Sequence, residues 1–278
     1  MANPRREYRP DRLYPWEVQK GLATRFTGHW IEYYAELPST NRRARELATG
    51  PASPPEGLLV LAEKQTAGRG RLGRSWFSPA GTGIWMTLLL KPAFPPGELP
   101  KLTLLAAAAV ARAVSAELEL TPLIKWPNDL YLDNRKIAGI LAETAGKAGA
   151  PWEYLLLGIG INVNQTAADF PGDLQEKAGS LRMSLGAPVD RITLLRRCLA
   201  VLEEEYVYAR ENGFARALAY CRQYSLTLGR RVEVKSGDRC YRGKAVAIRD
   251  DGSLELLLDD GTGAAGIATG EVSFISPY

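Results

Sequence analysis

Apolar residues alternate with polar ones, or form short continuous runs, in six segments within the first 164 residues. Alternation is typical of a strand with one exposed face, and a continuous run is typical of a strand buried on both faces. The strands predicted in this way cover residues 30–36, 58–62, 84–90, 123–133, 136–143 and 154–164. A short polar turn at residues 134 and 135 joins two of these strands and predicts a hairpin.

Apolar positions spaced three and four residues apart predict helices among and after these strands. In the longest helix, residues 96–120, Leu102, Leu105, Ala109 and Ala113 share one face. Its most apolar run, residues 102–111, is too short to cross a bilayer, so we expect a buried helix. Shorter helices are predicted over residues 15–22, 42–49, 174–185, 190–212 and 213–224.

The pattern changes near residue 226, where short strands separated by glycine turns replace the helices. These strands are predicted at residues 231–235, 242–249, 253–258 and 271–275. Several short strands at this spacing are typical of a small β-barrel. We therefore divide the chain into an N-terminal extension (1–29), a main domain (30–226) and a C-terminal domain (227–278).

Composition narrows the class of protein. The chain has 278 residues, of which 46% are hydrophobic and 24% charged, values typical of a soluble globular protein. Its net charge of +4 favours a small anionic ligand but is far below that of a dedicated nucleic-acid-binding protein. Three widely spaced cysteines and the sole histidine, His29, argue against a disulfide framework, a zinc site and a histidine-based triad. The first residues lack the apolar core of a secretory signal, so we expect a cytoplasmic protein that binds neither DNA nor a membrane.

A loop that interleaves glycine with arginine separates the predicted strands 58–62 and 84–90. Its glycines are Gly68, Gly70 and Gly73, and its arginines are Arg69, Arg71 and Arg74. We call residues 68–76 the arginine loop. Its spacing matches the dinucleotide pattern G-x-G-x-x-G, but no helix follows and no acidic residue lies about 20 positions on, so that fold is excluded. Two alternatives stay open: a solvated hairpin loop, and a loop that closes over a carboxylate or phosphate through its guanidinium groups.

Polar residues also lie within or beside the apolar strands of the predicted hairpin; they are Lys125, Asn128, Asp129 and Lys136. They are either exposed charges or parts of a site. Gly139, Gly158 and Gly160 lie inside predicted strands, where glycine commonly marks the close approach of a ligand or of another backbone. These three positions favour a flat-walled pocket.

Five short motifs follow one another along the chain: Ser39-Thr40-Asn41, Gln65 with Gly68 to Trp76, Lys125 to Asp129, Lys136 with Gly139 to Glu143, and Gly158 to Asn162. Together they resemble the biotin protein ligase family, over about residues 30–278. The resemblance implies an α+β fold, with a mixed β-sheet catalytic domain of the biotin/lipoate ligase type and a small C-terminal SH3-like β-barrel. Some members carry an N-terminal DNA-binding domain and repress transcription. Residues 1–29 are too short for one, so we expect the form without it.

The resemblance implies a two-step, ATP-dependent ligase reaction. Biotin and MgATP first give biotinyl-5′-AMP and pyrophosphate, and a specific lysine of a biotin carrier protein domain then attacks the adenylate. Biotin and ATP are thus the implied substrates, with Mg²⁺ entering alongside ATP. The sequence leaves open the magnesium ligands, the identity of the acceptor, and whether the protein is a monomer or a homodimer.

The resemblance also assigns roles to individual residues. Those implied in catalysis are Arg69, Lys125, Asp129 and Lys136. Those implied in biotin binding are Ser39, Thr40, Asn41, Gln65, Gly68, Arg69, Gly70, Arg71, Trp76, Lys136, Gly139 and Gly158. Those implied in ATP and adenylate binding are Arg69, Arg71, Arg74, Trp76, Lys125, Asn128, Lys136 and Asn162. We expect Arg69 and Lys136 to converge where the two anionic reactants meet, and the arginine loop to act as a lid.

Two other functions are compatible with parts of the sequence. One is a lipoate or octanoate ligase or transferase of the same fold, against which the polar Gln65 and the Ser39-Thr40-Asn41 motif argue. The other is a non-catalytic phosphate- or nucleic-acid-binding protein that uses Arg69, Arg71 and Arg74 on phosphates. It would leave the lysines and aspartate of the hairpin without a role.

Overall fold

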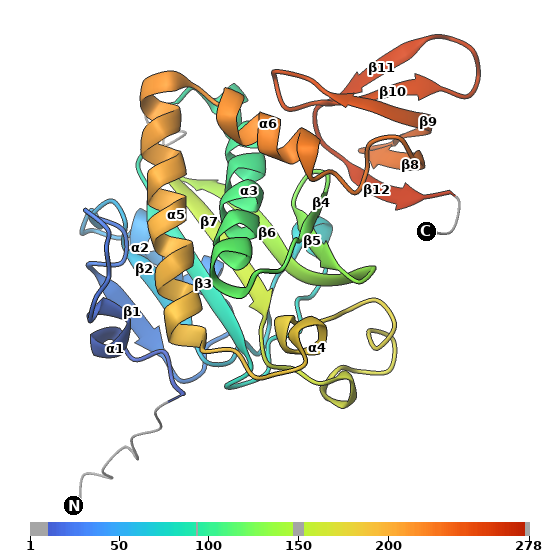
Figure 1. Ribbon diagram of the computed structural model, residues 1–278. Coiled ribbons are helices and arrows are strands. Elements are labelled where there is room, and N and C mark those ends of the chain that lie inside the picture. Colours follow the sequence, from blue (N-terminus) through green and yellow to red (C-terminus); the bar gives the residue numbers. More distant parts are fainter. Residues whose placement is uncertain (1–10, 93, 147–152, 276–278) are drawn as a thin grey trace, which may run out of the picture.

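The computed structural model describes residues 11–92, 94–146 and 153–275. Seven strands form one sheet in the order β1-β2-β3-β7-β6-β5-β4 (Figure 1). The pair β1 and β2 is parallel, and the neighbours from β2 to β4 are antiparallel, so the predicted mixed sheet and α+β class are confirmed. The strands are β1 Ile31–Tyr34, β2 Leu59–Ala62, β3 Gly83–Leu90, β4 Leu123–Lys125, β5 Asp129–Leu132, β6 Arg135–Ala145 and β7 Tyr154–Asn162.

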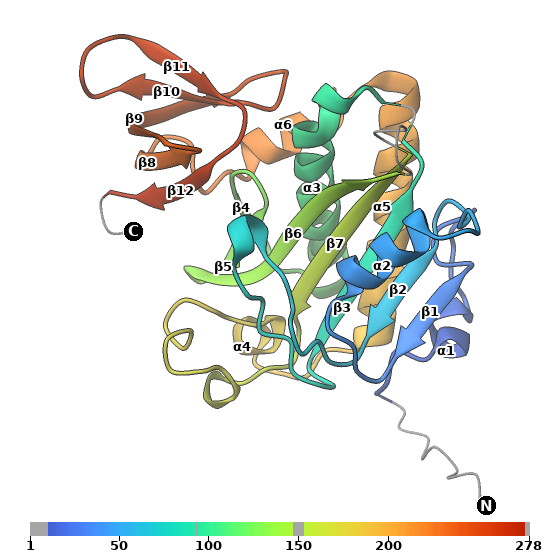
Figure 2. The same ribbon diagram turned by 180° about the vertical axis from the view of Figure 1, so that it is seen from behind.

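Helices cover both faces of this sheet. On one face lie α3 Leu99–Leu118, α5 Arg191–Asn212 and α6 Ala215–Gln223, and on the other lies α2 Thr40–Thr49 (Figures 1 and 2). Successive residues of β3 are buried on opposite faces of the sheet. Leu88 belongs to the larger core under α3 and α5, and Leu89 packs with α2. By length and composition α3 is apolar enough to span a membrane, but it is mostly buried, which marks it as the core helix of a globular domain.

Two predicted elements are shorter than expected. The strand predicted over residues 123–133 is two strands, β4 and β5, because the turn of Trp126, Pro127 and Asn128 interrupts it. The helix predicted over residues 174–185 is only α4 Leu181–Leu185, which begins where the Ser180 side chain accepts a hydrogen bond from the Met183 backbone. Residues 172–177 form turns instead, and Ala178 forms an isolated bridge with Lys136.

A second, five-stranded sheet follows α6. Its strands are β8 Arg231–Ser236, β9 Arg239–Ile248, β10 Leu254–Leu258, β11 Ala264–Ile267 and β12 Glu271–Phe274. They are antiparallel in the order β11-β10-β9-β8-β12, and among the described residues no pairing joins β11 to β12. The predicted small all-β unit is therefore confirmed. Closure of its strands into a barrel is not observed among the described residues. The pattern did not predict β11, whose Ala-Ala-Gly-Ile sequence has little β-propensity.

The described part of the predicted N-terminal extension packs onto the main domain. The Glu203 carboxylate, on α5, accepts hydrogen bonds from the backbone N–H groups of Arg25, Phe26 and Thr27 at 2.5, 3.1 and 2.9 Å. The short helix α1 Pro15–Gln19 lies against α5 and β1. Residues 1–10 lie outside the described residues, and the division into three regions stays a prediction.

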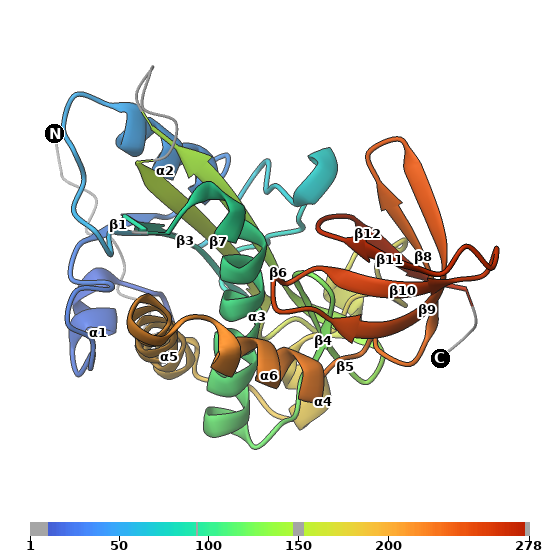
Figure 3. The same cartoon turned by 90° about the horizontal axis from the view of Figure 1, so that it is seen from above.

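The two sheets meet where the hairpin of β4 and β5 faces the C-terminal strands (Figure 3). The indole N–H of Trp126, in the turn after β4, donates to the Gly252 carbonyl at 3.0 Å. Arg222, on α6, donates to the Ile248 carbonyl at 2.7 Å. These bonds hold the smaller sheet beside the end of the larger one.

Candidate active site

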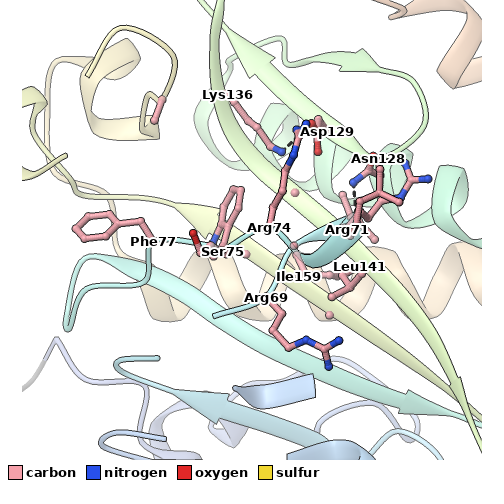
Figure 4. Close-up of a pocket in the computed structure, with 18 of the residues that line it drawn as sticks. Arg69, Arg71, Arg74, Ser75, Phe77, Asn128, Asp129, Lys136, Leu141 and Ile159 are labelled. Carbon is pink, nitrogen blue, oxygen red and sulfur yellow. Dashed lines mark hydrogen bonds and ion pairs between the residues drawn. The ribbon is translucent and has the colours of Figure 1, made fainter. Parts of the chain in front are cut away.

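A cavity of about 330 Å³ opens on the α2 face of the sheet, within the size range of small-molecule sites. Its wall combines the start of α2, strands β3, β6 and β7, the arginine loop, the turn between β4 and β5, and the start of β12. Figure 4 shows side chains from the loop, the hairpin and the central strands around this space. Segments more than 200 residues apart in the sequence thus share one pocket, as the distance from Ser39 to Glu271 along the chain illustrates.

Sixteen of the seventeen predicted site residues line this cavity. They are Ser39, Thr40, Asn41, Gln65, Arg69, Gly70, Arg71, Arg74, Trp76, Lys125, Asn128, Asp129, Lys136, Gly139, Gly158 and Asn162. Gly68 lies behind the wall, where a side chain would strike the Trp76 carbonyl oxygen and the Ser78 hydroxyl. Glycine is therefore needed at position 68 for the packing of the loop on itself.

A pair of opposite charges lies at the hairpin end of the cavity. The Lys136 ammonium is 2.7 Å from Asp129 Oδ2 and 5.2 Å from the centre of the Trp76 ring (Figure 4). Asp129 Oδ1 is buried and has no hydrogen-bond partner among the described residues. The carboxylate thus fixes the lysine, and its second oxygen keeps unused hydrogen-bonding capacity among the described residues.

Lys125 reaches the same end of the cavity between aromatic rings. Its ammonium lies 5.6 Å from the centre of the Tyr131 ring and 4.9 Å from that of Phe274, on β12. Burial lowers the pKa of Lys125, an effect that the nearby Asp129 carboxylate opposes. An anion bound beside Lys125 would offset this cost of burial, which suits a phosphate.

Glycines 139 and 160 make room for an indole. A side chain at Gly160 would strike the Trp76 ring nitrogen, and one at Gly139 would come within 3.2 Å of the same ring. Trp76 therefore lies flat on β6 and β7 and forms an apolar wall. Its ring nitrogen is buried without a hydrogen-bond partner among the described residues.

Gly158 makes room for a protein side chain rather than directly for a ligand. A Cβ at this position would overlap the Asn41 amide, which lies over β7. The Asn41 amide nitrogen donates to Glu143 Oε2 at 2.9 Å, and the Asn41 amide oxygen accepts from the Thr87 hydroxyl at 2.6 Å. From the sequence, Gly158 was predicted to form part of a flat pocket wall, and no role was predicted for Thr87 or Glu143.

The three arginines of the loop point to different partners. Arg69 lies 3.7 Å from Glu143 Oε1, and its guanidinium points away from Lys136 and Asp129 (Figure 4). Arg69 and Lys136 therefore line one cavity, as predicted, but their charged ends do not converge. Arg74 forms an ion pair with Glu271 of β12.

Arg71 is held at the boundary between the two sheets. Its guanidinium donates to Asn128 Oδ1 at 3.0 Å, to Thr269 Oγ1 at 3.0 Å and to the Gly270 carbonyl at 3.1 Å. Burial lowers the pKa of Arg71 because desolvation disfavours the charged guanidinium, and Asp129 and Glu271 act in the opposite direction. The C-terminal strands thus complete the cavity, a contribution that no sequence motif predicted.

Two family models match the chain. Residues 34–162 match the biotin/lipoate A/B protein ligase family, and residues 227–274 match the biotin protein ligase C-terminal domain. The bifunctional ligase/repressor BirA of Bacillus subtilis is 38% identical over 253 residues, which are 91% of this chain and 77% of that protein. The biotin–acetyl-CoA-carboxylase ligase of Mycobacterium tuberculosis is 33% identical over 273 residues, 94% of this chain and 97% of that protein.

Solved structures agree with the sequence comparisons. The biotin protein ligase of Aquifex aeolicus, in complex with biotin and ATP, superimposes with a TM-score of 0.75 at 29% identity. The match covers 88% of this chain and 98% of the Aquifex chain. On the evidence of both of its domains, this chain belongs to the biotin protein ligase family.

Proposed function

We propose that this protein is an ATP-dependent biotin–protein ligase, which activates biotin as biotinyl-5′-AMP and transfers it to a lysine of a biotin carrier protein. Relatives with that activity in their names match nearly the whole chain. The observation that carries the proposal is the single cavity that joins a neutral, hydrogen-bonding end at Thr40 and Gln65 to a cationic end at Lys125 and Lys136. Biotin has a polar, uncharged ureido head and a carboxylate tail, which match these two ends.

The first step joins two anions. A biotin carboxylate oxygen attacks the α-phosphorus of ATP, the new P–O bond forms, and the bond to the bridging oxygen breaks so that pyrophosphate leaves with the electron pair. Bringing the two charges to about 4 Å costs about 4 kcal/mol at an effective dielectric near 20. We assign Lys136 and Arg69 to the reacting oxygens and Lys125 to the phosphates. Asp129 holds Lys136 in place.

The second step releases AMP. The neutral amine of the carrier lysine attacks the biotinyl carbonyl carbon, a C–N bond forms, and the bond to the phosphate oxygen breaks. The amine loses a proton in this step, and the free Oδ1 of Asp129 is an acceptor at the same end of the cavity. Until the amine arrives the mixed anhydride must be kept from water. We assign this task to the arginine loop, through Arg69 and Arg71.

The remaining predicted residues fall into two groups by position. Ser39, Thr40, Asn41 and Gln65 lie at the polar end of the cavity and are assigned, with the backbone of Gly70, to the ureido head. Trp76, Arg74, Asn128 and Asn162 are assigned to the adenosine side. Asn162 also has a structural role, because its amide donates to the Gly179 carbonyl at 2.9 Å.

Magnesium is proposed to enter as MgATP. Within residues 11–92, 94–146 and 153–275, no three His, Cys, Asp or Glu side chains gather as a metal site. Mg²⁺ in nucleotide enzymes commonly takes one or two carboxylates and completes its shell with phosphate oxygens and water. Asp129 Oδ1, which is buried beside Lys125 and Lys136, fits the role of the single protein carboxylate.

The acceptor protein, the compartment and the oligomeric state extend the proposal. We expect the carrier to be a biotin carboxyl carrier domain and the compartment to be the cytoplasm, where thiols such as the exposed Cys240 stay reduced. Among the described residues, strand β1 has a hydrogen-bonded neighbour on one side only, so its other edge could pair with a second copy of the chain or with the carrier. Light scattering of the protein with and without the carrier distinguishes self-association from carrier binding.

The experiment that tests the function is biotin-dependent exchange of pyrophosphate into ATP, followed by mass spectrometry of a carrier domain. Exchange that biotin supports and lipoate does not, with one biotinyl group added to the carrier, is the expected result. Exchange supported by lipoate or octanoate would instead favour the other branch of the family that matches residues 34–162. No exchange with any of these acids would refute the proposal.

A further inference from the structure

A row of four side chains runs beneath the polar end of the cavity, from Glu143 through Asn41 and Thr87 to Thr40. We propose that Glu143 and Thr87, which do not line the cavity, are positioning residues that fix the Thr40 hydroxyl as a hydrogen-bond acceptor. The site would then select an acid whose head group carries an N–H donor. This inference rests on the proposed function, because it takes the ureido N–H of biotin to be that donor.

The row begins with the orientation of the Asn41 amide. Its nitrogen lies 2.9 Å from Glu143 Oε2 and 3.4 Å from the Leu141 carbonyl oxygen, and both of these atoms can only accept. The reversed amide would set oxygen against oxygen at both contacts. The guanidinium groups of Arg45 and Arg69, 3.6 and 3.7 Å from Glu143, balance the carboxylate charge. The Asn41 amide oxygen must therefore face Thr87.

The Thr87 hydroxyl has one proton and two close neighbours. It lies 2.6 Å from the Asn41 amide oxygen and 2.9 Å from Thr40 Oγ1, and Thr87 is fully buried. Because an amide oxygen has no proton to give, Thr87 must donate to Asn41. The contact between the two threonines is then a hydrogen bond only if Thr40 donates to Thr87.

This arrangement consumes every proton that Thr40 has to offer. Its backbone N–H donates to Gln65 Oε1 at 2.9 Å, and its hydroxyl proton has two acceptors, the nearer Thr87 Oγ1 at 2.9 Å and Gln65 Oε1 at 3.2 Å. Gln65 is oriented in turn, since its nitrogen donates to the Ser78 hydroxyl at 2.9 Å. What Thr40 presents to a ligand in the cavity is a lone pair.

A lone pair accepts an N–H and repels an oxygen or sulfur atom in the same place. A site whose buried groups are committed to one polarity rejects an analogue that lacks the matching group more strongly than an apolar pocket rejects a change of size. The dithiolane ring of lipoate has no N–H to donate. Thr87 and Glu143 would thus contribute to the choice of acid from outside the binding surface.

The test measures how the full-length protein discriminates between biotin and its two cyclic carbamate analogues, in each of which one ring N–H is replaced by oxygen. Titration calorimetry would compare the wild-type protein with Thr87→Val and Thr87→Ser. Valine keeps the shape of threonine and removes the hydroxyl, so the nearer acceptor of the Thr40 proton is lost. Only the longer contact to Gln65 Oε1, at 3.2 Å, then competes with a ligand oxygen in the cavity for this proton. We expect biotin to bind about ten-fold more weakly to Thr87→Val, the effect of one lost hydrogen bond.

The decisive quantity is the ratio of the biotin and carbamate affinities. For one of the two carbamates this ratio should fall at least several-fold in Thr87→Val, because the freed Thr40 hydroxyl can donate to the new oxygen. Thr87→Ser should restore the wild-type ratio, and ATP affinity should not change in either variant. Thr103→Val, which removes a hydroxyl bonded only to the Leu99 carbonyl of α3, is the matched control.

An unchanged ratio in Thr87→Val overturns the proposal. If that variant does not fold, Glu143→Gln serves instead, because glutamine can donate to a reversed Asn41 amide and so release the Thr40 proton; an unchanged ratio there overturns the proposal equally. Failure of the wild-type protein to bind biotin at all would instead refute the proposed function, so the two failures are distinguishable.

Discussion

The Arg71 guanidinium lies 3.1 Å from the Gly270 carbonyl oxygen, so the arginine loop of the larger domain is bonded directly to the smaller one. Thr269 adds a second bond to Arg71, and the ion pair of Arg74 with Glu271 adds a third connection. A loop held in this way is anchored to the C-terminal strands. The lid that we propose would therefore depend on both domains.

Removing the Arg71 anchor should release the intermediate. Arg71→Gly deletes three hydrogen bonds from a charged donor, each worth about 1.5 to 3 kcal/mol. Loss of even one of them would speed the escape of biotinyl-5′-AMP by about ten-fold or more. A stopped-flow release assay measures this rate, with Arg239→Gly on the exposed hairpin of β8 and β9 as the control. Unchanged retention of the adenylate would show that the loop is not the lid.

Neutralising Glu271 should have a smaller effect of the same kind. Glu271→Gln removes the charge that pairs with Arg74, whose side chain is 65% exposed. Exposed pairs contribute about 0.2 to 1 kcal/mol, so adenylate release should accelerate no more than about five-fold. Glu233→Gln, which breaks a pair with Arg242 in the same small domain, is the matched control. Equal rates in the two variants would exclude a role of the Arg74–Glu271 pair in holding the loop.

Lys136 should matter to the chemistry more than to binding. Lys136→Met removes the cation beside Asp129, and loss of one preorganised charge or donor typically lowers the rate by about 10²- to 10³-fold. We expect a fall of this size in biotin-dependent pyrophosphate exchange, with a much smaller change in the Kd for ATP. Lys244→Met, at an exposed position of β9, should leave both quantities unchanged. A decrease in the exchange rate of less than ten-fold would show that Lys136 does not act on the reacting atoms.

The buried Lys125 should make stability depend on pH. Burial lowers its pKa in the folded protein, so between that value and the unfolded value near 10.4 the unfolded chain binds more protons. The contribution of this group to the free energy of unfolding therefore rises with pH through that window. At pH values below the window, the buried charge destabilises the folded protein to its full extent. Urea unfolding between pH 7 and about 10 should show the rise, and Lys125→Met should flatten it. A parallel slope in the variant would assign the effect to other groups.

A methyl group at position 158 should disturb the polar end of the cavity. Gly158→Ala forces the Asn41 amide away from β7, which breaks its bonds to Glu143 and Thr87. We expect a loss of about ten-fold or more in biotin affinity, while ATP binding persists. Gly97→Ala, where nothing lies within 4 Å of the new methyl group, is the control. Unchanged biotin affinity in Gly158→Ala would show that the position of Asn41 does not matter to the ligand.

The sequence predicted those parts of the molecule in which neighbours in the chain are also neighbours in space. Alternating patterns, continuous apolar runs and turn spacing located all but one of the described strands. Short motifs such as Lys125 to Asp129 kept their residues on one cavity. Two kinds of feature could not be predicted from the sequence. The wall formed by Gly270 and Glu271 depends on how the domains dock, which no local pattern encodes. In the sequence, Thr87 cannot be told apart from the other residues of a buried strand. Its role comes from its contacts with Asn41 and Thr40, which only the structure shows.

One such feature affects how the protein is made. The strand that closes the cavity, β12, is the last that the structure describes, so the ribosome synthesises the reactive lysines and the arginine loop long before it. A nascent or truncated chain that lacks residues 269–274 would have no C-terminal anchor for the loop. By the argument made for Arg71→Gly, such a fragment would release the acyl phosphate, so retention of this reactive acylating agent has to wait until the C-terminal strands have been made and have docked.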